Sequence, residues 1–227
     1  MLSVIMSIYN NERTLKSSIN SILEQTYQDF ELLIMDDNST DKSYDILKEY
    51  ESKDSRIRIF RNEKNLGLTK SLNILIANSQ GDFIARQDGD DKSHKLRFQN
   101  QIKYLTEDNY DFSVTRAKII QSDSLIPKLT YFLPKKQIIK FKNPFIHGTL
   151  IIKKETLLEI GCYDENFYYA QDYKLFTDLL KNNLKFKYLK TPLYYLNSEG
   201  NISNINKKEQ GYYAKCVKQN QVPNLIK

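Results

Sequence analysis

Three carboxylates stand close together in the first half of the sequence: Asp88, Asp90 and Asp91. They follow Phe83-Ile84-Ala85, a short apolar run that is typical of a buried strand. Two such charges about 4 Å apart repel each other by roughly 4 kcal/mol at an effective dielectric constant of about 20. A strand end that gathers three of them needs water, basic partners or a cation. Carboxylate oxygens are good ligands for Mg²⁺ or Mn²⁺, which keep positions open for phosphate oxygens. The cluster therefore indicates either a metal–phosphate site or a solvated acidic turn.

A second acidic cluster follows the apolar run from Phe30 to Met35. A run that does not alternate between apolar and polar residues is typical of a strand buried on both faces of a parallel sheet. Asp36, Asp37 and Asp41 come directly after this run or close to it. They could cap the helix that follows, or they could contact a ligand at the strand end.

The spacing of apolar residues predicts alternating strands and helices over about the first ninety residues. The strands are expected at 3–8, 30–35, 56–61 and 83–85. Such alternation implies βαβ units with right-handed crossovers and a mostly parallel sheet. Ligands of open α/β sheets bind at the carboxyl ends of the strands, where both acidic clusters fall. The expected fold class is therefore α/β, with helices flanking a mostly parallel central sheet.

The later elements are less regularly patterned. We expect a helix over 94–105, strands over 111–120 and 145–152, a helix that begins at Gln171-Asp172, and strands over 185–189 and 193–196. The stretch 121–142 contains two prolines and the pair Lys135-Lys136. It predicts a mobile loop over the site.

Length and composition favour one domain. The 227 residues can bury an ordinary core. We expect residues 1–196 to form it, followed by a basic polar tail over 197–227. The net charge of +6 is carried by dispersed basic residues, which argues against a nucleic-acid partner. The two cysteines make no disulfide framework, and no apolar run approaches the roughly 20 residues of a membrane span. The expectation is a soluble, cytoplasmic protein.

Six segments, in order, resemble the family 2 glycosyltransferases of the GT-A fold. They are Ser3–Asn10, Phe30–Asp41, Asn65–Asn73, Gly81–Asp91, Asn143–Gly148 and Tyr169–Tyr173. The resemblance covers roughly residues 2 to 196, and six segments in order are far more specific than any one. It implies a Rossmann-like GT-A domain that moves a sugar from a nucleotide diphosphate to an acceptor hydroxyl, with inversion. It also implies a nucleotide-binding half over 1–91 and an acceptor half over 92–196.

The resemblance assigns roles to single residues. Contacts with the nucleotide are expected from Tyr9, Asn10, Glu12, Asp37, Lys70, Asp88 and Asp90, and contacts with a Mn²⁺ or Mg²⁺ cofactor from Asp90, Asp91 and His147. Asp37 would accept a hydrogen bond from the N–H group of a uracil ring, and Tyr9 would lie against the base. A divalent ion neutralises the charge that develops on the leaving diphosphate. Lys70 could instead belong to a solvated helix face, and His147 could be a core residue.

Inversion needs one carboxylate that takes the proton of the acceptor hydroxyl, as in single-displacement glycosidases. Asp172 is the expected base, and the alternative is a plain N-cap of the helix that begins there. The family usually has Glu-Asp at this place, whereas the chain has Gln171-Asp172. The first acid is therefore lost and the base is kept. Tyr168, Tyr169 and Tyr173 either form an acceptor wall or pack in the core.

The expected donor is a UDP-hexose or a UDP-N-acetylhexosamine. The expected acceptor is a hydroxyl of a growing cell-surface glycan or glycolipid, such as a lipooligosaccharide or capsule. The basic tail and the 121–142 loop could hold the protein at the anionic inner face of the membrane. A sugar nucleotidylyltransferase is one alternative, but it would need a glycine-rich basic loop where the chain has Tyr9–Glu12. An inactive module that only binds nucleotide is the other.

Overall fold

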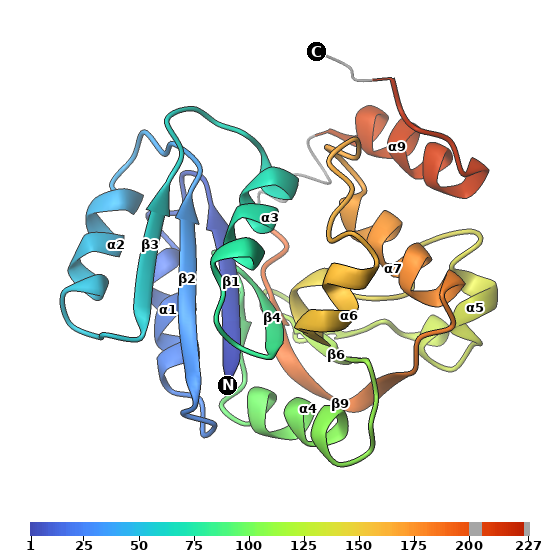
Figure 1. Ribbon diagram of the computed structural model, residues 1–227, viewed down its shortest axis with the longest axis horizontal. Coiled ribbons are helices and arrows are strands. Elements are labelled where there is room, and N and C mark those ends of the chain that lie inside the picture. The colour runs from blue at the N-terminus through green and yellow to red at the C-terminus, as the bar shows by residue number, and fades with distance from the viewer. Residues whose placement is uncertain (200–205, 225–227) are drawn as a thin grey trace.

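The computed structural model describes residues 1–199 and 206–224. They form a single α/β domain, in which helices pack against both faces of one curled, mixed sheet (Figure 1). The long strand pairings are parallel and the short ones are mostly antiparallel. The expected α/β fold with a mostly parallel sheet is therefore confirmed.

The first half of the chain alternates strands and helices, as the apolar spacing predicts. The elements are β1 (Leu2–Ile8), α1 (Leu15–Leu23), β2 (Phe30–Asp36), α2 (Ser43–Glu51), β3 (Ile57–Arg61), α3 (Leu68–Asn78) and β4 (Phe83–Asp88). The four strands pair in parallel in the order β3-β2-β1-β4. The carboxyl ends of β1, β2 and β4 therefore lie side by side.

Strand β1 is buried on both faces because its apolar residues alternate between two cores. Ile5 belongs to a cluster that includes Leu72 and Leu75 of α3. Val4 and Met6 belong to a second cluster on the other face, which is formed with residues of α1 and α2. This double burial explains why the run shows no alternation of polar and apolar residues.

The second half of the chain extends the same sheet. Its elements are β5 (Lys92–Ser93), α4 (Arg97–Thr106), β6 (Phe112–Ile119), β7 (Leu125–Ile126), η1 (Leu129–Tyr131), α5 (Lys135–Ile138), η2 (His147–Thr149), β8 (Ile151–Lys153), α6 (Lys154–Glu159), α7 (Gln171–Lys181), β9 (Phe186–Leu196) and α9 (Lys207–Gln219). Beyond β4 the strand order is β8-β6-β9-β5, and β7 pairs with β6 beside this path. Strand β8 is antiparallel to both of its neighbours, whereas β9 is parallel to β6.

Two sequence predictions in this half were wrong. The expected strand over 145–152 is interrupted by the 3₁₀ helix η2, and only Ile151–Lys153 is a strand. Gly148 lies in this interruption, and a Cβ there would lie 2.2 Å from the hydroxyl oxygen of Tyr194, so the position has no room for a side chain. The two late strands are one strand, β9, whose register against β6 shifts on either side of Arg116. Pro192, which in the sequence suggested a break, pairs with Arg116 at this irregular point of the register.

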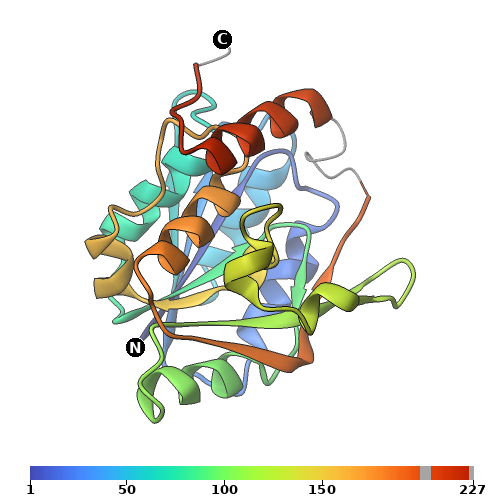
Figure 2. The same cartoon turned by 90° about the vertical axis from the view of Figure 1, so that its right-hand side faces the viewer.

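Helix α9 joins the domain through its apolar side. Tyr213, Cys216 and Val217 are buried in the cluster that also contains α7 residues, and Figure 2 shows α9 lying over α7. The expected tail over 197–227 is thus, in its described part, a packed helix with basic residues on the outside. Residues 200–205 and 225–227 of that stretch lie outside the described ranges.

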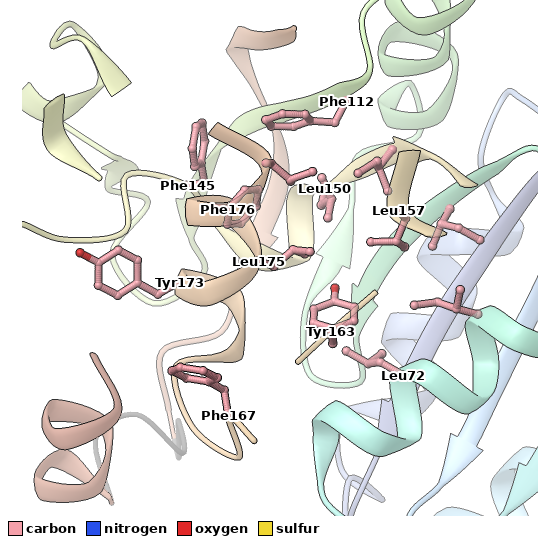
Figure 3. Close-up of a cluster of buried hydrophobic side chains, with 14 of the residues drawn as sticks. Leu72, Phe112, Phe145, Leu150, Leu157, Tyr163, Phe167, Tyr173, Leu175 and Phe176 are labelled. Carbon is pink, nitrogen blue, oxygen red and sulfur yellow. The ribbon is translucent and has the colours of Figure 1, made fainter. Parts of the chain in front are cut away.

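Aromatic side chains fill the core around α7. Phe145 lies 4.6 Å from Phe176 and 6.1 Å from Phe112 between ring centroids, and Figure 3 shows these rings on one side of α7. Tyr173 and Tyr163 belong to the same cluster. These ring contacts pack α7 against β6 and against the segment before η2.

Within the described residues, no helix is both long enough and apolar enough to cross a bilayer.

Candidate active site

Most of the predicted site residues follow the carboxyl ends of β1, β2 and β4, whereas Lys70, His147 and Asp172 lie in α3, η2 and α7. In the sheet register, Ile8 lies opposite Asp36, and Ser7 lies opposite Asp88. The backbone N–H of Asp37 donates to the carbonyl of Ile8 at 2.9 Å. The two acidic clusters therefore flank the loop that follows β1, as the parallel sheet predicts.

Asp36, at the end of β2, has a structural role. Its side chain is fully buried. One carboxylate oxygen accepts from the N–H of Ser39 at 3.0 Å, and the other lies 3.1 Å from Nε of Arg61. Arg61 also stacks over the ring of Tyr44 at 4.1 Å. These contacts fix the turn between β2 and α2.

Asp37 binds the loop before α3. Its Oδ1 accepts from Asn62 Nδ2 at 2.7 Å and from the N–H of Leu66 at 2.8 Å, and its Oδ2 accepts from the N–H of Gly67 at 2.8 Å. A carboxylate offers about four acceptor positions, so one remains. The uracil contact expected from Asp37 would use that last position and stays a prediction.

The loop after β1 is tied to the loop after β2. Asn10 Oδ1 accepts from the N–H of Thr40 at 2.8 Å, and Glu12 Oε2 accepts from the N–H of Lys42 at 3.0 Å. The side chain of Tyr9 is 49% exposed. All three of these predicted nucleotide contacts are exposed, but Asn10 and Glu12 use side-chain oxygens to hold the loop, whereas Tyr9 makes no such side-chain bond to any described residue.

Tyr168 covers the same corner from the opposite half of the chain. A Cβ on Gly67 would lie 2.4 Å from its ring, so the ring rests directly on the backbone there. Burial raises the pKa of Tyr168, with smaller contributions from Tyr169, Asp37 and Tyr9. Tyr168 is 45% exposed and is therefore not a core residue, and its part in an acceptor wall stays a prediction.

Lys70 is placed as predicted, one turn into α3. Its side chain is exposed and makes no hydrogen bond or ion pair with any residue in the described part of the chain. Tyr173, in contrast, is buried and donates its hydroxyl to the carbonyl of Ile139 at 2.5 Å. Tyr173 is therefore a packing residue.

Arg86 neutralises part of the acidic triplet. This buried guanidinium donates through Nη2 to Oδ1 of Asp88. Its Nε is buried and has no hydrogen-bond partner among the described residues. The N–H of Asp88 donates to the hydroxyl of Tyr194 at 3.2 Å, and Arg97, below it, donates to the carbonyl of Arg86 at 2.8 Å.

The other two acids carry uncompensated charge. Burial, and then the charge of Asp88, raises the pKa of Asp90 to about 6. Asp91 accepts from the N–H of Asn197 at 2.7 Å and from the hydroxyl of Tyr194. Burial and the neighbouring carboxylates nevertheless raise the pKa of Asp91 well above its usual value. The protein gathers these like charges without supplying enough positive groups to balance them.

This donor set fits a divalent cation. Crowded carboxylates with raised pKa values gain most from a bound positive charge. Within residues 1–199 and 206–224, no three His, Cys, Asp or Glu side chains enclose an ion by themselves. Such a site suits an ion whose other positions are filled by water and phosphate oxygens. Asp90 is the best-placed ligand, because no other described residue donates a hydrogen bond to its carboxylate.

His147 lies in η2 and faces Tyr163. Its Nε2 is 2.7 Å from the hydroxyl oxygen of Tyr163. Burial, and then the charge of Arg86, lowers the pKa of His147 well below its usual value. The imidazole is therefore neutral near pH 7, as a metal ligand must be, but its metal role stays a prediction.

Asp172 lies inside the first turn of α7. Its Oδ2 accepts from Asn143 Nδ2 at 2.8 Å. The cap of the helix is Ala170, which has a left-handed backbone with a φ of 54°. That conformation costs an alanine about 1–2 kcal/mol. Burial raises the pKa of Asp172, hydrogen bonds from Tyr173 and Asn143 oppose the increase, and the charge of Asp88 adds to it.

Electrostatic contacts join the two halves into one site. The charges of Asp88 and Asp172 both act on Tyr163, and Arg86 acts on both Tyr163 and His147. That Asp172 faces the acidic triplet, more than eighty positions away in the sequence, stays a prediction.

Sequence reasoning missed three supporting residues. Asn143 holds Asp172, and it opens a segment that the resemblance quoted without giving it a role. Tyr194 and Asn197 hold Asp88 and Asp91 from the end of β9. No local signal could have revealed these two, because their contacts depend on how β9 returns to the acidic corner.

A polar cavity of about 450 Å³ lies outside this site. It is lined by residues of α3, α7 and the turn after α6, including Asn73, Cys162, Asp164 and Lys174. The ammonium group of Lys174, which lines this cavity, already forms ion pairs: Nζ lies 2.5 Å from Asp178 Oδ2 and 3.7 Å from Asp164 Oδ2.

The chain is similar to several known proteins. WfgD of Escherichia coli, a UDP-Glc:alpha-D-GlcNAc-diphosphoundecaprenol beta-1,3-glucosyltransferase, is 33% identical over 185 residues, which are 81% of this chain and 71% of WfgD. A relative from Bacillus subtilis (strain 168) is 38% identical over 165 residues, but the match spans only 56% of its length.

Two solved structures share the fold. S. aureus TarS 1–349 in complex with UDP has a TM-score of 0.77 at 22% identity, covering 96% of this chain and 64% of that one. The mannosyltransferase PcManGT from Pyrobaculum calidifontis, in complex with GDP-Man and Mn²⁺, has a TM-score of 0.74 at 16% identity, covering 98% of this chain and 65% of that one.

The sequence pattern of glycosyl transferase family 2 matches residues 3–172, from β1 to the candidate base. This match covers well over half of the chain, and the solved structures share its GT-A architecture. The chain therefore belongs to glycosyl transferase family 2.

Proposed function

We propose that the protein is an inverting, metal-dependent glycosyltransferase. It moves a hexose or N-acetylhexosamine from a UDP donor to a hydroxyl of a growing cell-surface glycan. The observation that carries this proposal is the acidic triplet at the end of β4, where no other described residue donates a hydrogen bond to the carboxylate of Asp90. The family pattern, which runs from β1 to Asp172, supports a reaction that uses both this cluster and a base.

Asp172 is the base in this reaction. In a single displacement, the acceptor hydroxyl attacks the anomeric carbon while a carboxylate on the same side takes its proton. The raised pKa of Asp172 brings its proton affinity closer to neutral pH, where a general base acts best. Asn143 holds one oxygen of Asp172, which leaves the other oxygen for the acceptor.

The donor lies across the ends of β1, β2 and β4 in this proposal. Asp37 accepts from the base with its remaining acceptor position, and Tyr9 covers the ring. Asp88 and Lys70 contact the rest of the nucleotide. The unpartnered Nε of Arg86 supports an anionic ligand nearby, since a buried donor without a partner is costly.

Mn²⁺ or Mg²⁺ is held by Asp90 and Asp91, with His147 as a further candidate ligand. When bound, the ion neutralises the charge of the leaving diphosphate as a Lewis acid. The Mn²⁺ in the structure of PcManGT, and the UDP in that of TarS, support this assignment by likeness of fold.

The acceptor is a glycolipid in this proposal. WfgD, by its name, acts on a sugar linked to diphosphoundecaprenol, and this chain has no membrane-crossing helix among its described residues. We place the protein in the cytoplasm and peripherally on the anionic inner face of the membrane.

A donor-hydrolysis screen tests the function. UDP release is measured across UDP-sugars with Mn²⁺ and with EDTA, and then with Asp91→Asn and Asp172→Asn. Hydrolysis of one or a few donors should require the metal. The Asp91→Asn variant should no longer hydrolyse these donors. Asp172→Asn should keep UDP binding and lose transfer by about 10²–10⁴-fold.

Asp178→Asn is the matched control, because it removes a carboxylate of the same helix that pairs with Lys174 instead. Full transfer by Asp172→Asn would refute its role as the base. UDP binding without any turnover by the wild type would identify an inactive module.

A further inference from the structure

The segment 128–142 carries apolar side chains that the fold leaves uncovered. Leu129, Phe132, Leu133 and Phe141 are 81%, 71%, 45% and 71% exposed. They account for four of the nine large hydrophobic residues that are exposed in the described part of the chain. Clustered apolar side chains on a soluble surface mark an interaction site.

The apolar side chains are not left over from a loose loop, because the segment has a fixed underside. The ammonium of Lys135 is buried and donates to the carbonyls of Thr130 at 3.0 Å, Tyr131 at 2.5 Å and Leu133 at 2.9 Å. The ring of Tyr131 packs edge-on against the ring of Tyr188, with 5.2 Å between the ring centroids. These contacts hold the turn in place while Leu129 and Phe132 project from it.

Positive charge surrounds these apolar side chains. Lys128, Lys136, Lys140 and Lys142 are exposed. None of them forms an ion pair within residues 1–199 and 206–224, and the sequence has no acidic residue between Asp123 and Glu155. An exposed apolar segment whose charged residues are all lysines is complementary to anionic lipid, into whose headgroup region aromatic and aliphatic side chains insert.

The same segment borders the base. Asn143, directly after Lys142, donates to Asp172, and Tyr173 donates to the carbonyl of Ile139. Figure 1 places α5 at the edge of the molecule farthest from α2 and β3. A membrane under this edge would lie on the acceptor side of the site, away from the nucleotide-binding strands.

We infer that residues 128–142 form a membrane-docking surface that binds a bilayer containing anionic phospholipid. Phe132, Phe141, Leu129 and Leu133 insert between headgroups, and the four exposed lysines contact lipid phosphates. The link to the acceptor rests on the proposed function: a lipid-linked sugar would reach Asp172 from the bilayer without a membrane-spanning helix.

Helix α9 is the natural comparison surface. Its exposed lysines are Lys207, Lys208, Lys215 and Lys218. Its apolar side is already buried against α7, so it offers charge without insertion. Both surfaces carry four exposed lysines, which makes a matched pair of variants available.

Flotation with vesicles tests the docking surface. Wild-type protein is mixed with vesicles of phosphatidylcholine alone, or of equal parts phosphatidylcholine and phosphatidylglycerol. We expect binding to the anionic vesicles to be stronger on the order of a hundredfold. The double variant Phe132→Ser/Phe141→Ser should weaken binding by at least about tenfold.

Charge variants separate the two basic surfaces. Replacing Lys128, Lys136, Lys140 and Lys142 with glutamine should weaken binding by about a hundredfold. The same replacement of the four α9 lysines should have a much smaller effect. Leu158→Ser, which removes an exposed leucine of α6, should bind as the wild type does.

UDP binding with Mn²⁺, measured by calorimetry without vesicles, keeps the two proposals apart. Wild type and all of these variants should bind UDP equally. Vesicle binding without UDP binding would refute the proposed function and leave the docking surface intact.

The docking inference is overturned by equal binding to neutral and anionic vesicles, by no vesicle binding at all, or by a larger loss from the α9 variant. It is also overturned if the double phenylalanine variant only breaks a dimer seen by light scattering, because the surface would then bind a second copy of the chain.

Discussion

Two strand ends on either side of β1 differ in how the protein contacts their carboxylates. At the end of β2, Asp36 and Asp37 receive hydrogen bonds and an ion pair from the protein. At the end of β4, Asp90 receives no hydrogen bond from another described residue, and its pKa rises to about 6. Both clusters look alike in the sequence. The difference teaches that similar acidic clusters can have different roles: the protein provides partners for both acids of the first cluster, but it leaves Asp90 of the second without a donor from another described residue.

Catalysis offers the largest expected contrast. Asp90→Asn should lower sugar transfer by about a hundredfold or more, because a metal site that is lost removes several kcal/mol of charge stabilisation. Asp36→Asn should lower transfer only a few-fold when assayed well below its unfolding temperature. Initial rates at saturating Mn²⁺ measure both. Equal losses in the two variants would erase the distinction between the strand ends.

The stability of the metal-free protein should change in opposite directions. Asp37→Ala leaves three donors without their acceptor and should lower the free energy of unfolding by about 3 kcal/mol. Asp90→Asn removes a repelled charge and should raise it by about 1 kcal/mol. The full pKa shift would correspond to about 3 kcal/mol, which partial exposure reduces. Urea unfolding in EDTA measures both.

Added Mn²⁺ is the control for this experiment. At about a hundred times its dissociation constant, the ion should stabilise the wild type by about 2.7 kcal/mol. It should stabilise Asp37→Ala by as much and Asp90→Asn by clearly less. A stabilisation of Asp90→Asn equal to that of the wild type would place the metal elsewhere.

A change around Asp172 should have a smaller effect on sugar transfer. Among the described residues, Asp172 has one side-chain donor, Asn143, which places it between the well-partnered Asp37 and the unpartnered Asp90. Asn143→Ala removes that donor from the ionised form, so the pKa of Asp172 rises further. The base must be ionised, and transfer should therefore fail at a higher pH as the solution is acidified, with a shift of about half a unit to one unit. The pH–rate profile measures it, and Asn166→Ala, in an exposed turn, is the control. An unchanged acidic limb would show that another group sets it.

The nucleotide-binding half was largely predictable from sequence. Its strands bury both faces, so runs such as Phe30–Met35 are apolar throughout, and the helices between them keep a clear spacing. The acidic clusters were recognisable because they end such runs. What the sequence could not show was which cluster the protein completes, since the donors to Asp37 come from Asn62, Leu66 and Gly67.

The acceptor half was less predictable because its structure depends on contacts between distant segments. The strand expected over 145–152 is interrupted at Gly148, where the ring of Tyr194 leaves no room for a side chain. Pro192 suggested a break in a strand that in fact continues with an irregular register. Asp172 was identified by resemblance, whereas its partner Asn143 follows from the fold alone.

The hydrogen bond from the backbone N–H of Asn197 to Asp91 bears on how far the chain can be shortened. The family pattern ends at residue 172, but β9 returns afterwards to brace the acidic corner through Tyr194 and Asn197. A chain cut after residue 172 would keep the whole stretch that matches the family pattern. It would lose β9, and with it the contacts from Tyr194 and Asn197 that hold Asp88 and Asp91 in position.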